Sequence, residues 1–408
     1  MKNRNSRSAK FENTKQALEL ILHWQSAFAS HTDRMLFAAN YPARINLPGD
    51  LHTCLDNASF GETVFASFPS GSLIEYYPNQ FIQLPYACIQ PIGNTGIRVE
   101  PRQGRFYPRC IIAGSLGIDH HDRQPMRIID TNASSFTVDL NHPLANLAIE
   151  VGVRLMPLTD NPQTTLNEST EPLNTALATG IGLQKMLDQS PDFYDQDMFT
   201  RQDSSNDAIF YRQKRMVHHI DQSASDTITQ IYRRELLPQM RVLDLMSSWQ
   251  SHLPNDITDL HITGLGMNDS ELLANPDLDD YVVHDLNQQP SLPFSNDFFD
   301  LTLCSLSIEY LVDPLSVLHE VIRVTRPGGK LLVSFSNRSF QSKAITIWHE
   351  LHLFERLGLV LDLMLRTRGL IDLTTETLQG QPRAANDIYS GKLMSGDPVF
   401  VVSATVNR

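Results

Sequence analysis

The stretch that most constrains this chain is RVLDLMSSW, residues 241–249. An apolar strand that ends in an acid, here Asp244, normally runs into a glycine-rich turn. Glycine lets the backbone approach a ligand closely and take conformations closed to other residues. The turn at 246–250 contains no glycine. The segment therefore predicts the first strand of a nucleotide-type α/β fold whose ligand-binding turn is altered.

Length and composition indicate a folded protein of two or three domains. The 408 residues are 41% hydrophobic and 19% charged, which argues against disorder. A net charge of −13 argues against a general binder of nucleic acid or anionic membranes. No apolar run reaches the roughly 20 residues that span a bilayer. The four cysteines are far apart and include no CxxC pair, so we expect reduced thiols and a cytoplasmic location.

The N-terminal part is predicted to contain a helix followed by strands. The basic start MKNRNSRSAK is interpreted as a solvated, frayed end rather than a targeting signal. Residues 11–40 show a helical period, with Leu18 and Leu22 on one edge, and predict a helix. From about 50 to 157, the strand-like segments ETVFASF, RIIDTNASSFTVDL and LAIEVGVRL are separated by turn residues. The polar residues 158–175 predict a linker.

The C-terminal part shows alternating helices and short apolar strands. Residues 180–240 have a helical pattern, and Asp221–Leu236 should form one amphipathic helix that ends before Pro238. Five strand candidates follow between 241 and 336: VLDL, ITGLGM, YVVHDL, FDLTLCSL and KLLVSFS. Continuous apolar strands that alternate with helices indicate a parallel sheet covered on both faces.

Residues 292–338 carry a specific resemblance. The segment reads LPFSNDFFDLTLCSLSIEYLVDPLSVLHEVIRVTRPGGKLLVSFSNR. With its surroundings, about 205–370 plus the last strands, it resembles the type 11-like group of class I S-adenosylmethionine-dependent methyltransferases, which methylate small molecules. The resemblance implies a Rossmann-like fold and S-adenosyl-L-methionine as cofactor. The turn and the following Ser-His-Leu-Pro, 251–254, resemble a subfamily of bacterial and plant homologues with an Asp-Leu-(Met/Cys)-Ser-Ser-Trp turn.

The resemblance also implies roles for residues at the strand ends. Asp244 would face the methionine part of the cofactor, Asp285 would bind the adenine amine beside the Leu286 amide, and Ser305 would lie near the sulfonium. Asp244 and Asp285 have alternative readings as a structural acid and a turn cap, and Trp249 has one as a core residue. The full predicted cofactor set is Asp244, Met246, Ser247, Ser248, Trp249, Gly266, Met267, Asn268, Asp285, Leu286 and Ser305.

Two positions depart from the family pattern. The glycine loop is replaced by Met246–Gln250, in which serine hydroxyls could bond a carboxylate. The acid that would hold the ribose at the end of the second strand is Gly266, with Asn268 or Asp269 nearby as weaker substitutes.

Methyl transfer mainly requires alignment of the nucleophile and exclusion of water. A base is needed only where the acceptor loses a proton, and the predicted catalytic candidates are Tyr310, His349 and His352. We weighed a metal site at His349, His352 and Glu355 against a polar helix face or substrate lid, and predict no metal. The segment HHID, 218–221, is either a helix cap or part of the pocket wall.

Residues 104–156 resemble a different family. The segment resembles the SlyD-like FKBP-type prolyl isomerases through VDLNHPLA, in which the matching residues are Val138, Asp139, Asn141, His142, Pro143, Leu144 and Ala145. The resemblance implies a half-barrel with an apolar cleft that twists a prolyl amide. The alternative is that the same side chains form only a small β core. The candidate cleft residues are Tyr76, Phe81, Phe106, Tyr107, Phe136 and Leu144.

These observations predict an α/β protein in which a Rossmann-like class I methyltransferase domain follows a β-rich FKBP-like domain with an N-terminal helix. The expected boundaries are 1–160 for the FKBP-like domain, 161–200 for the linker and lead-in, and 201–408 for the methyltransferase-like domain. The expected function is methylation of a small-molecule acceptor or of a protein held by the N-terminal domain, without nucleic-acid or membrane partners. The alternatives are a non-catalytic binding protein and a prolyl isomerase or chaperone with an appended domain.

Overall fold

The computed structural model describes residues 16–39, 45–90, 99–157, 169–184, 192–195, 197–384, 387–393 and 395–408. Its strands are β1 (Gln16–Gln25), β2 (Ser30–Ala39), β3 (Thr63–Phe68), β4 (Phe81–Pro85), β5 (Phe106–Pro108), β6 (Pro125–Thr131), β7 (Ser135–Asp139), β8 (Ile149–Pro157), β9 (Arg241–Leu245), β10 (His261–Gly266), β11 (Asp280–Val283), β12 (Phe299–Ser305), β13 (Thr325–Phe335), β14 (Leu370–Gln379) and β15 (Val399–Val406). Its α-helices are α2 (Leu51–Asn57), α3 (Pro172–Ala178), α4 (Asp207–Phe210), α5 (Gln222–Arg233), α6 (Asp269–Ala274), α7 (Pro314–Val324), α8 (Thr346–Glu350) and α9 (Leu353–Arg366). Within these ranges, no helix has the length and apolarity to cross a membrane.

The C-terminal half forms an open, twisted sheet. Its strand order is β11-β10-β9-β12-β13-β15-β14. The first five strands are parallel, and β15 is antiparallel to both of its neighbours. All five strands predicted between 241 and 336 are confirmed. The order reverses direction between β9 and β12, and ligands of such sheets bind beyond the carboxyl ends of the strands at this point.

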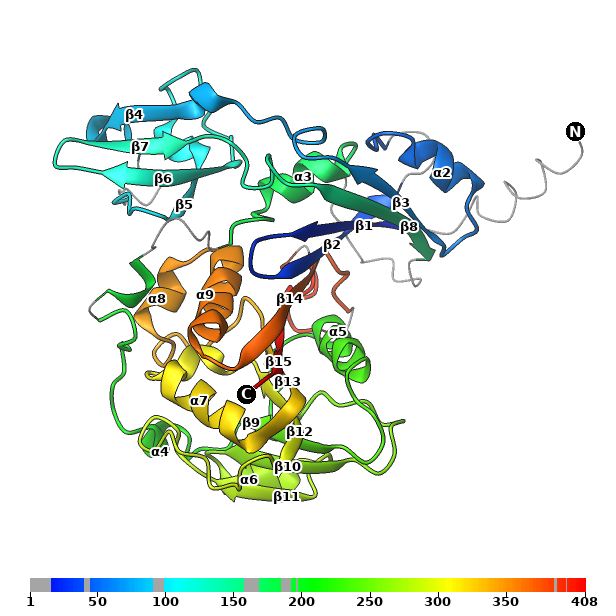
Figure 1. The fold of residues 1–408 in the computed structure, drawn as a ribbon, viewed down its shortest axis with the longest axis vertical. Coiled ribbons are helices and arrows are strands. Elements are labelled where there is room, and N and C mark those ends of the chain that lie inside the picture. The colour runs from blue at the N-terminus through cyan, green and yellow to red at the C-terminus, as the bar shows by residue number, and fades with distance from the viewer. Residues whose placement is uncertain are drawn as a thin grey trace, which may run out of the picture.

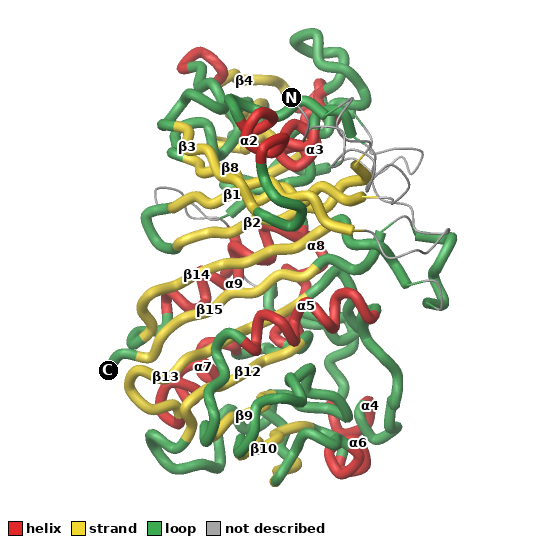
Figure 2. The backbone as a smooth tube through the Cα atoms, turned by 90° about the vertical axis from the view of Figure 1, so that its right-hand side faces the viewer, coloured by secondary structure: helices red, strands yellow, loops and turns green. Residues whose placement is uncertain are grey.

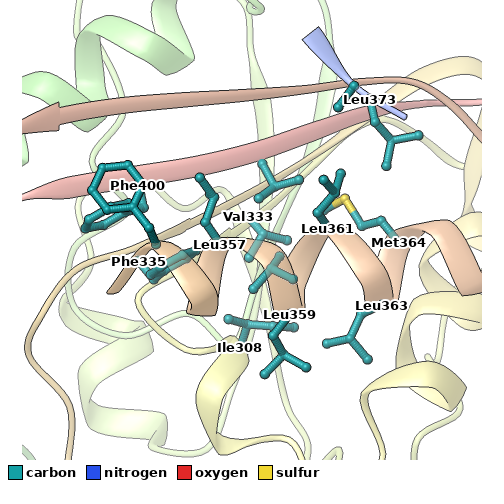
Figure 3. Close-up of a cluster of buried hydrophobic side chains, with 14 of the residues drawn as sticks. Ile308, Val333, Phe335, Leu357, Leu359, Leu361, Leu363, Met364, Leu373 and Phe400 are labelled. Atoms are coloured by element: carbon teal, nitrogen blue, oxygen red, sulfur yellow. The ribbon is translucent and has the colours of Figure 1, made fainter. Parts of the chain in front are cut away.

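Successive side chains of a strand in this sheet pack into two different hydrophobic cores, one on each face. Val242 packs with α5, whereas Leu243 belongs to the core that includes α7 and α9. This alternation follows from the two-residue period of a strand. Figure 3 shows α9 placing Leu357, Leu361 and Met364 among the buried side chains of that second core. Helices therefore cover both faces, as the continuous apolar strands predicted.

The helix predicted over Asp221–Leu236 is confirmed, but it ends earlier than expected, at Arg233. The side chain of Asp221 caps α5 by accepting a hydrogen bond from the Ala224 amide at 2.9 Å. The helix ends at Arg233, ahead of Pro238, which cannot donate a backbone hydrogen bond. The rest of the described lead-in from 197 to 220 is irregular apart from the single turn of α4.

The helix predicted over 11–40 is wrong, and so is the N-terminal helix of the predicted fold. The described part of that segment is a hairpin in which β1 pairs with β2 and with β8. Because β1 is central and buried on both faces, apolar residues occupy consecutive positions and mimic a helical period. The two-residue period of Leu18, Leu20 and Leu22, all buried in one core, was the better guide.

The N-terminal hairpin continues the C-terminal sheet. β2 pairs in parallel with β14, which gives one sheet of eleven strands that ends β14-β2-β1-β8-β3 (Figure 2). Buried polar contacts fix this seam: Asp33 accepts hydrogen bonds from the Trp24 indole at 2.7 Å and the Thr377 hydroxyl at 2.8 Å. The predicted domain boundary at 160 and the first part of the predicted linker lie outside the described residues, as do residues 1–15.

Residues 81–139 form a second, four-stranded sheet with the order β4-β7-β6-β5. It lies at one end of the molecule (Figure 1) and has its own apolar core. The predicted cleft residues do not share one surface: Phe106, Phe136 and Leu144 are buried, whereas Tyr76 and Phe81 are exposed.

A buried acid behind the C-terminal sheet makes stability depend on pH. Glu309 is 1% exposed, and its Oε2 has no hydrogen-bond partner among the described residues. Burial raises the pKa of this carboxyl from 4.5 to about 7. The folded protein therefore takes up a proton that the unfolded chain does not hold, and this contribution to stability is lost as pH rises through about 4.5 to 7.

We expect Glu309→Gln to lose less stability than the wild type between pH 5 and pH 8, because its side chain carries no charge. Urea unfolding at several pH values measures this difference. Glu150→Gln, which removes an exposed acid on β8, is the control and should keep the wild-type slope. Equal slopes for the wild type and Glu309→Gln would contradict the expectation.

Candidate functional site

A cavity of about 410 Å³ lies at the carboxyl ends of β9, β10 and β12. Every residue of the predicted cofactor set except Trp249 lines it, and so does Tyr310. Other lining residues were not in the predicted set. Among them are residues from the segment before α5, from α6 and from the loops after β13 and β14: Tyr211, Arg215, His218, His219, Glu271, Arg338, Phe340 and Tyr389.

The altered turn is organised around the carboxylate of Asp244. Asp244 is 2% exposed and accepts hydrogen bonds from the hydroxyls of Ser247 at 2.5 Å and Ser251 at 2.7 Å. Burial raises the pKa of Asp244 to about 6, although both hydroxyls oppose the shift. The Ser247 hydroxyl therefore bonds an acid of the protein itself, and Asp244 both organises the turn and lines the cavity.

The second serine of the turn is bonded to an acid that the predicted set missed. Ser248 Oγ donates to Glu271 Oε2 at 2.7 Å, and the Arg215 amide donates to Glu271 Oε1 at 2.6 Å. Glu271 is the third residue of α6, whose N-cap is Asn268. An Asn followed three residues later by Glu is a helix-start signal, so the sequence contained a pointer to this residue.

The backbone path of the 246–248 turn explains why position 266 is a glycine. The Ser247 amide donates to the Leu265 carbonyl at 2.8 Å, which lays the turn across the end of β10. A Cβ atom at position 266 would lie 2.2 Å from the Ser247 carbonyl oxygen, closer than any real contact. Met246 takes a left-handed φ of 61°, a conformation that normally favours glycine. Residues 246–260, all of them described, form no helix after β9.

The two substitutes predicted for the missing ribose acid are engaged elsewhere. Asn268 Oδ1 accepts from the Glu271 amide, and its Nδ2 donates to the Tyr211 carbonyl at 2.7 Å. Asp269 accepts from the Tyr281 hydroxyl at 3.0 Å. Glu271, in the helix α6 that follows Gly266, is the acid of this stretch that lines the cavity.

Asp285 caps the turn after β11 and also lines the cavity. Its Oδ1 accepts from the amides of Asn287 at 3.0 Å and Gln288 at 3.3 Å, as a turn cap does. It also lines the cavity beside Leu286. Ser305, at the end of β12, bonds the Tyr232 hydroxyl at 2.7 Å.

The structure brings only one of the three catalytic candidates to the cavity. Tyr310 lines it, and its hydroxyl oxygen accepts from the Phe340 amide at 2.9 Å. Burial holds the pKa of Tyr310 well above its ordinary value, so it stays protonated and is no base at neutral pH. His349 is exposed on α8, and the side chain of His352 caps α9; neither lines the cavity.

His219 is the ionisable side chain best placed to take a proton. It lines the cavity with its ring 5.5 Å from that of Phe340, and no described residue hydrogen-bonds its nitrogens. Burial lowers the pKa of His219, which keeps the imidazole neutral at pH 7. The predicted set left this residue out, although the HHID segment had been considered as pocket wall. Trp249 lies outside the cavity lining. Its indole donates a hydrogen bond to the Val217 carbonyl at 3.1 Å, just ahead of the HHID segment.

A buried ionic cluster anchors the start of this cavity wall. Lys343 is fully buried, with Nζ 3.0 Å from Asp207 Oδ1 and 3.1 Å from Asp203 Oδ2. Arg201 pairs with Asp207 at 2.8 Å, and Asn287 Nδ2 also donates to Asp207. Burial alone would raise the pKa of Asp207, but these partners outweigh it and lower the pKa. The cluster fixes residues 201–210 against the sheet.

The fold and the cavity define an open α/β domain with a ligand site at its switch point. Residues 249–333 match the family described as "Methyltransferase domain". Part of the C-terminal half is therefore similar to methyltransferase domains.

Curated relatives match this chain over part of their length. A demethylmenaquinone methyltransferase of Renibacterium salmoninarum is 29% identical over 164 residues, which cover 38% of this chain and 63% of the relative. One from Paenarthrobacter aurescens is 31% identical over 88 residues, covering 22% of this chain and 32% of the relative. The chain thus spans less than two thirds of either relative.

Solved structures with similar folds cover about half of this chain. The [4+2]-cyclase SpnF is 18% identical with a TM-score of 0.34, covering 50% of this chain and 91% of the cyclase. A SAM-dependent methyltransferase from Aquifex aeolicus is 14% identical with a TM-score of 0.31, covering 44% of this chain and 89% of that structure.

Proposed function

We propose that this protein is an S-adenosylmethionine-dependent methyltransferase that acts on a small-molecule acceptor. The observation that carries the proposal is the cavity at the switch point of the sheet. It gathers Asp285, Leu286 and the 246–248 turn at the strand ends where this fold binds its ligand. Its volume of about 410 Å³ lies within the range of small-molecule sites.

The residues of the cavity suit this cofactor, although the glycine loop is absent. Asp285 and the Leu286 amide would hold the adenine, and the backbone of the 246–248 turn would lie along the methionine part. Glu271 would take the place of the acid missing after β10 and bond the ribose hydroxyls. The cofactor supplies a methyl group that is already activated, so the protein has to bind, orient and exclude water.

His219 would receive the proton of an acceptor hydroxyl or amine. His219 lines the cavity, and it is neutral at pH 7 because burial lowers its pKa. Phe340, which contacts both His219 and Tyr310, would help exclude water from the reacting atoms. This assigns the base to a segment ahead of α5 rather than to the helices that follow β13.

Calorimetric titration of S-adenosylhomocysteine into the full chain tests the proposal. We expect micromolar binding, and we expect Asp285→Ala to weaken it by about tenfold or more, because a hydrogen bond to a charged group is worth about 1.5–3 kcal/mol. Asp269→Ala, which removes an acid outside the cavity lining, is the control and should bind as the wild type does. If the wild type does not bind, the C-terminal half is a scaffold and the proposal fails.

For the N-terminal region we propose a relationship to the SlyD-like prolyl isomerases, based on the VDLNHPLA segment. In support, Asn141 ties the segment to Tyr77 by accepting from its amide at 2.8 Å and donating to its carbonyl at 3.0 Å. His142 is buried and bonds the Leu177 carbonyl at 3.3 Å, which suggests a structural role. A protease-coupled prolyl-peptide assay on the full chain, with no rate above background, would leave only a binding role.

We further propose that the protein acts in the cytoplasm, with the N-terminal region available to hold a protein acceptor. All four cysteines lie in the described ranges and none is paired, as is usual in a reducing compartment. The acidic charge balance is the reason we propose neither a nucleic-acid nor a membrane partner.

A further inference from the structure

The altered turn offers no free serine hydroxyl to the carboxylate of the proposed cofactor. Ser247 Oγ donates to Asp244, and Ser248 Oγ donates to Glu271. A hydroxyl has one hydrogen to donate, so neither serine is left to bond a ligand carboxylate. The two acids beside the turn also disfavour a third carboxylate, because like charges repel. The carboxylate of the methionine part therefore needs a cation from outside the turn.

Arg215 comes from a segment that is tied directly to this turn. It lies ahead of α5 and lines the cavity. Its amide donates to Glu271 Oε1 at 2.6 Å, and Ser248 Oγ donates to Oε2 of the same carboxylate at 2.7 Å. One shared acid thus holds the backbone of Arg215 beside the turn.

The guanidinium of Arg215 is oriented without an acid. Nη1 donates to the Gln213 carbonyl at 3.3 Å, and Nη2 donates to the Phe210 carbonyl at 3.1 Å. The group lies 4.2 Å from the centre of the Phe210 ring and 5.3 Å from that of Phe340. Among the described residues, no carboxylate pairs with it, and its remaining N–H groups have no acceptor. Carbonyls and aromatic faces fix a guanidinium in place, but they leave its positive charge without a counter-charge.

The other arginine of the described cavity wall is already paired. Arg338 Nε lies 2.8 Å from Asp397 Oδ2. The charge of Arg215, by contrast, acts on the cavity: burial lowers the pKa of His219, Glu271 opposes this shift, and Arg215 adds to it. Arg215 is therefore the arginine of this wall that is available to an anionic ligand.

We propose that Arg215 binds the carboxylate of the cofactor's methionine part and so compensates for the absent glycine loop. This inference rests on the proposed function, which places the cofactor in this cavity. A guanidinium suits the ligand because it can bond a carboxylate through two parallel hydrogen bonds. The ammonium group of the same methionine part suits the acids beside the turn, so each charge of the amino acid meets an opposite charge.

Calorimetric titration of the full chain with two ligands tests the proposal. The first is S-adenosylhomocysteine, and the second is its decarboxylated analogue, which keeps the adenosine, the thioether and the amine. We expect the wild type to bind the analogue about tenfold more weakly than S-adenosylhomocysteine. Arg215→Met should weaken S-adenosylhomocysteine by about tenfold and leave the affinity for the analogue within about twofold. Arg215→Lys should lose less, because lysine keeps the charge without the two-pronged geometry.

A matched control and the analogue itself make the outcome decisive. Arg212→Met removes an exposed arginine of the same segment that lies outside the cavity lining, and it should bind both ligands as the wild type does. Binding of the analogue by Arg215→Met shows that this variant is folded. The proposal is overturned if Arg215→Met weakens both ligands equally, which would make Arg215 only a support of the wall. It is also overturned if Arg215→Met keeps the wild-type affinity for S-adenosylhomocysteine, which would leave the guanidinium to a carboxylate of the acceptor. A wild type that binds neither ligand would refute the proposed function and this inference with it.

Discussion

Gly266→Asp will weaken S-adenosylhomocysteine binding by about 10- to 100-fold, although it restores the acid that the family pattern places at the end of the second strand. A Cβ atom at this position would lie 2.2 Å from the Ser247 carbonyl oxygen. The turn would have to move, and overpacking of this kind costs about 1–3 kcal/mol. Moving the turn also breaks the bond from the Ser247 amide to Leu265 that holds it over β10.

Calorimetry on Gly266→Asp and Met267→Asp separates the clash from the added charge. Met267 also lines the cavity, and its side chain already occupies the space that an acid there would need. Met267→Asp is expected to lose less affinity than Gly266→Asp. Tighter binding by Gly266→Asp than by the wild type would show that the turn does not lie where the structure places it.

Lys343→Met will lower the free energy of unfolding by about 3–5 kcal/mol, the range for breaking a buried ion pair. Lys343 is fully buried between Asp203 and Asp207, and its Nζ also donates to the Ser205 carbonyl at 3.0 Å. Without the ammonium group, Asp207 retains Arg201 and Asn287, but its carboxylate loses a charged partner in a site closed to water.

Urea unfolding with Lys330→Met as the matched control measures this effect. Lys330 also forms an ion pair, with Glu235, but its side chain is 44% exposed, and exposed pairs contribute about 0–1 kcal/mol. A loss of less than about 1 kcal/mol in Lys343→Met would mean that the cluster does not anchor the 201–210 segment as described.

The strands around the site could be predicted because each contains a short, largely apolar run. Leu243 and Leu245 pack on one face of the sheet and Val242 on the other, so a parallel strand needs apolar residues at every position. The same rule caused the N-terminal error. In β1 the residues from Ala17 to Leu22 are all buried, and a run without alternation does not reveal whether it is helical or extended.

No local sequence pattern predicted that β2 and β14 would pair and join the two halves of the chain in one sheet. The contacts that fix the seam between β2 and β14, such as His31 Nδ1 to Thr375 Oγ1 at 2.7 Å, connect residues 344 positions apart. Neither segment contains a motif for the other. The seam depends on which edges of the two sheets remain unpaired, and only the assembled fold determines that.

The site was predicted well in position and less well in role. The strand ends located the cavity, but the serines of the turn were expected to face a ligand. They bond Asp244 and Glu271 instead, because hydroxyls in a tight turn reach the nearest buried acids first. His219 belongs to the HHID segment that was considered as pocket wall, but its loop has no strand or helix pattern that could decide between that role and a helix cap.

A crystal structure of the full chain with S-adenosylhomocysteine tests the central claim most directly. The account predicts the adenine beside Asp285 and Leu286, the ribose near Glu271, and the Ser247 hydroxyl still bonded to Asp244. A cofactor bound elsewhere, or one whose carboxylate takes the Ser247 hydroxyl, would contradict it.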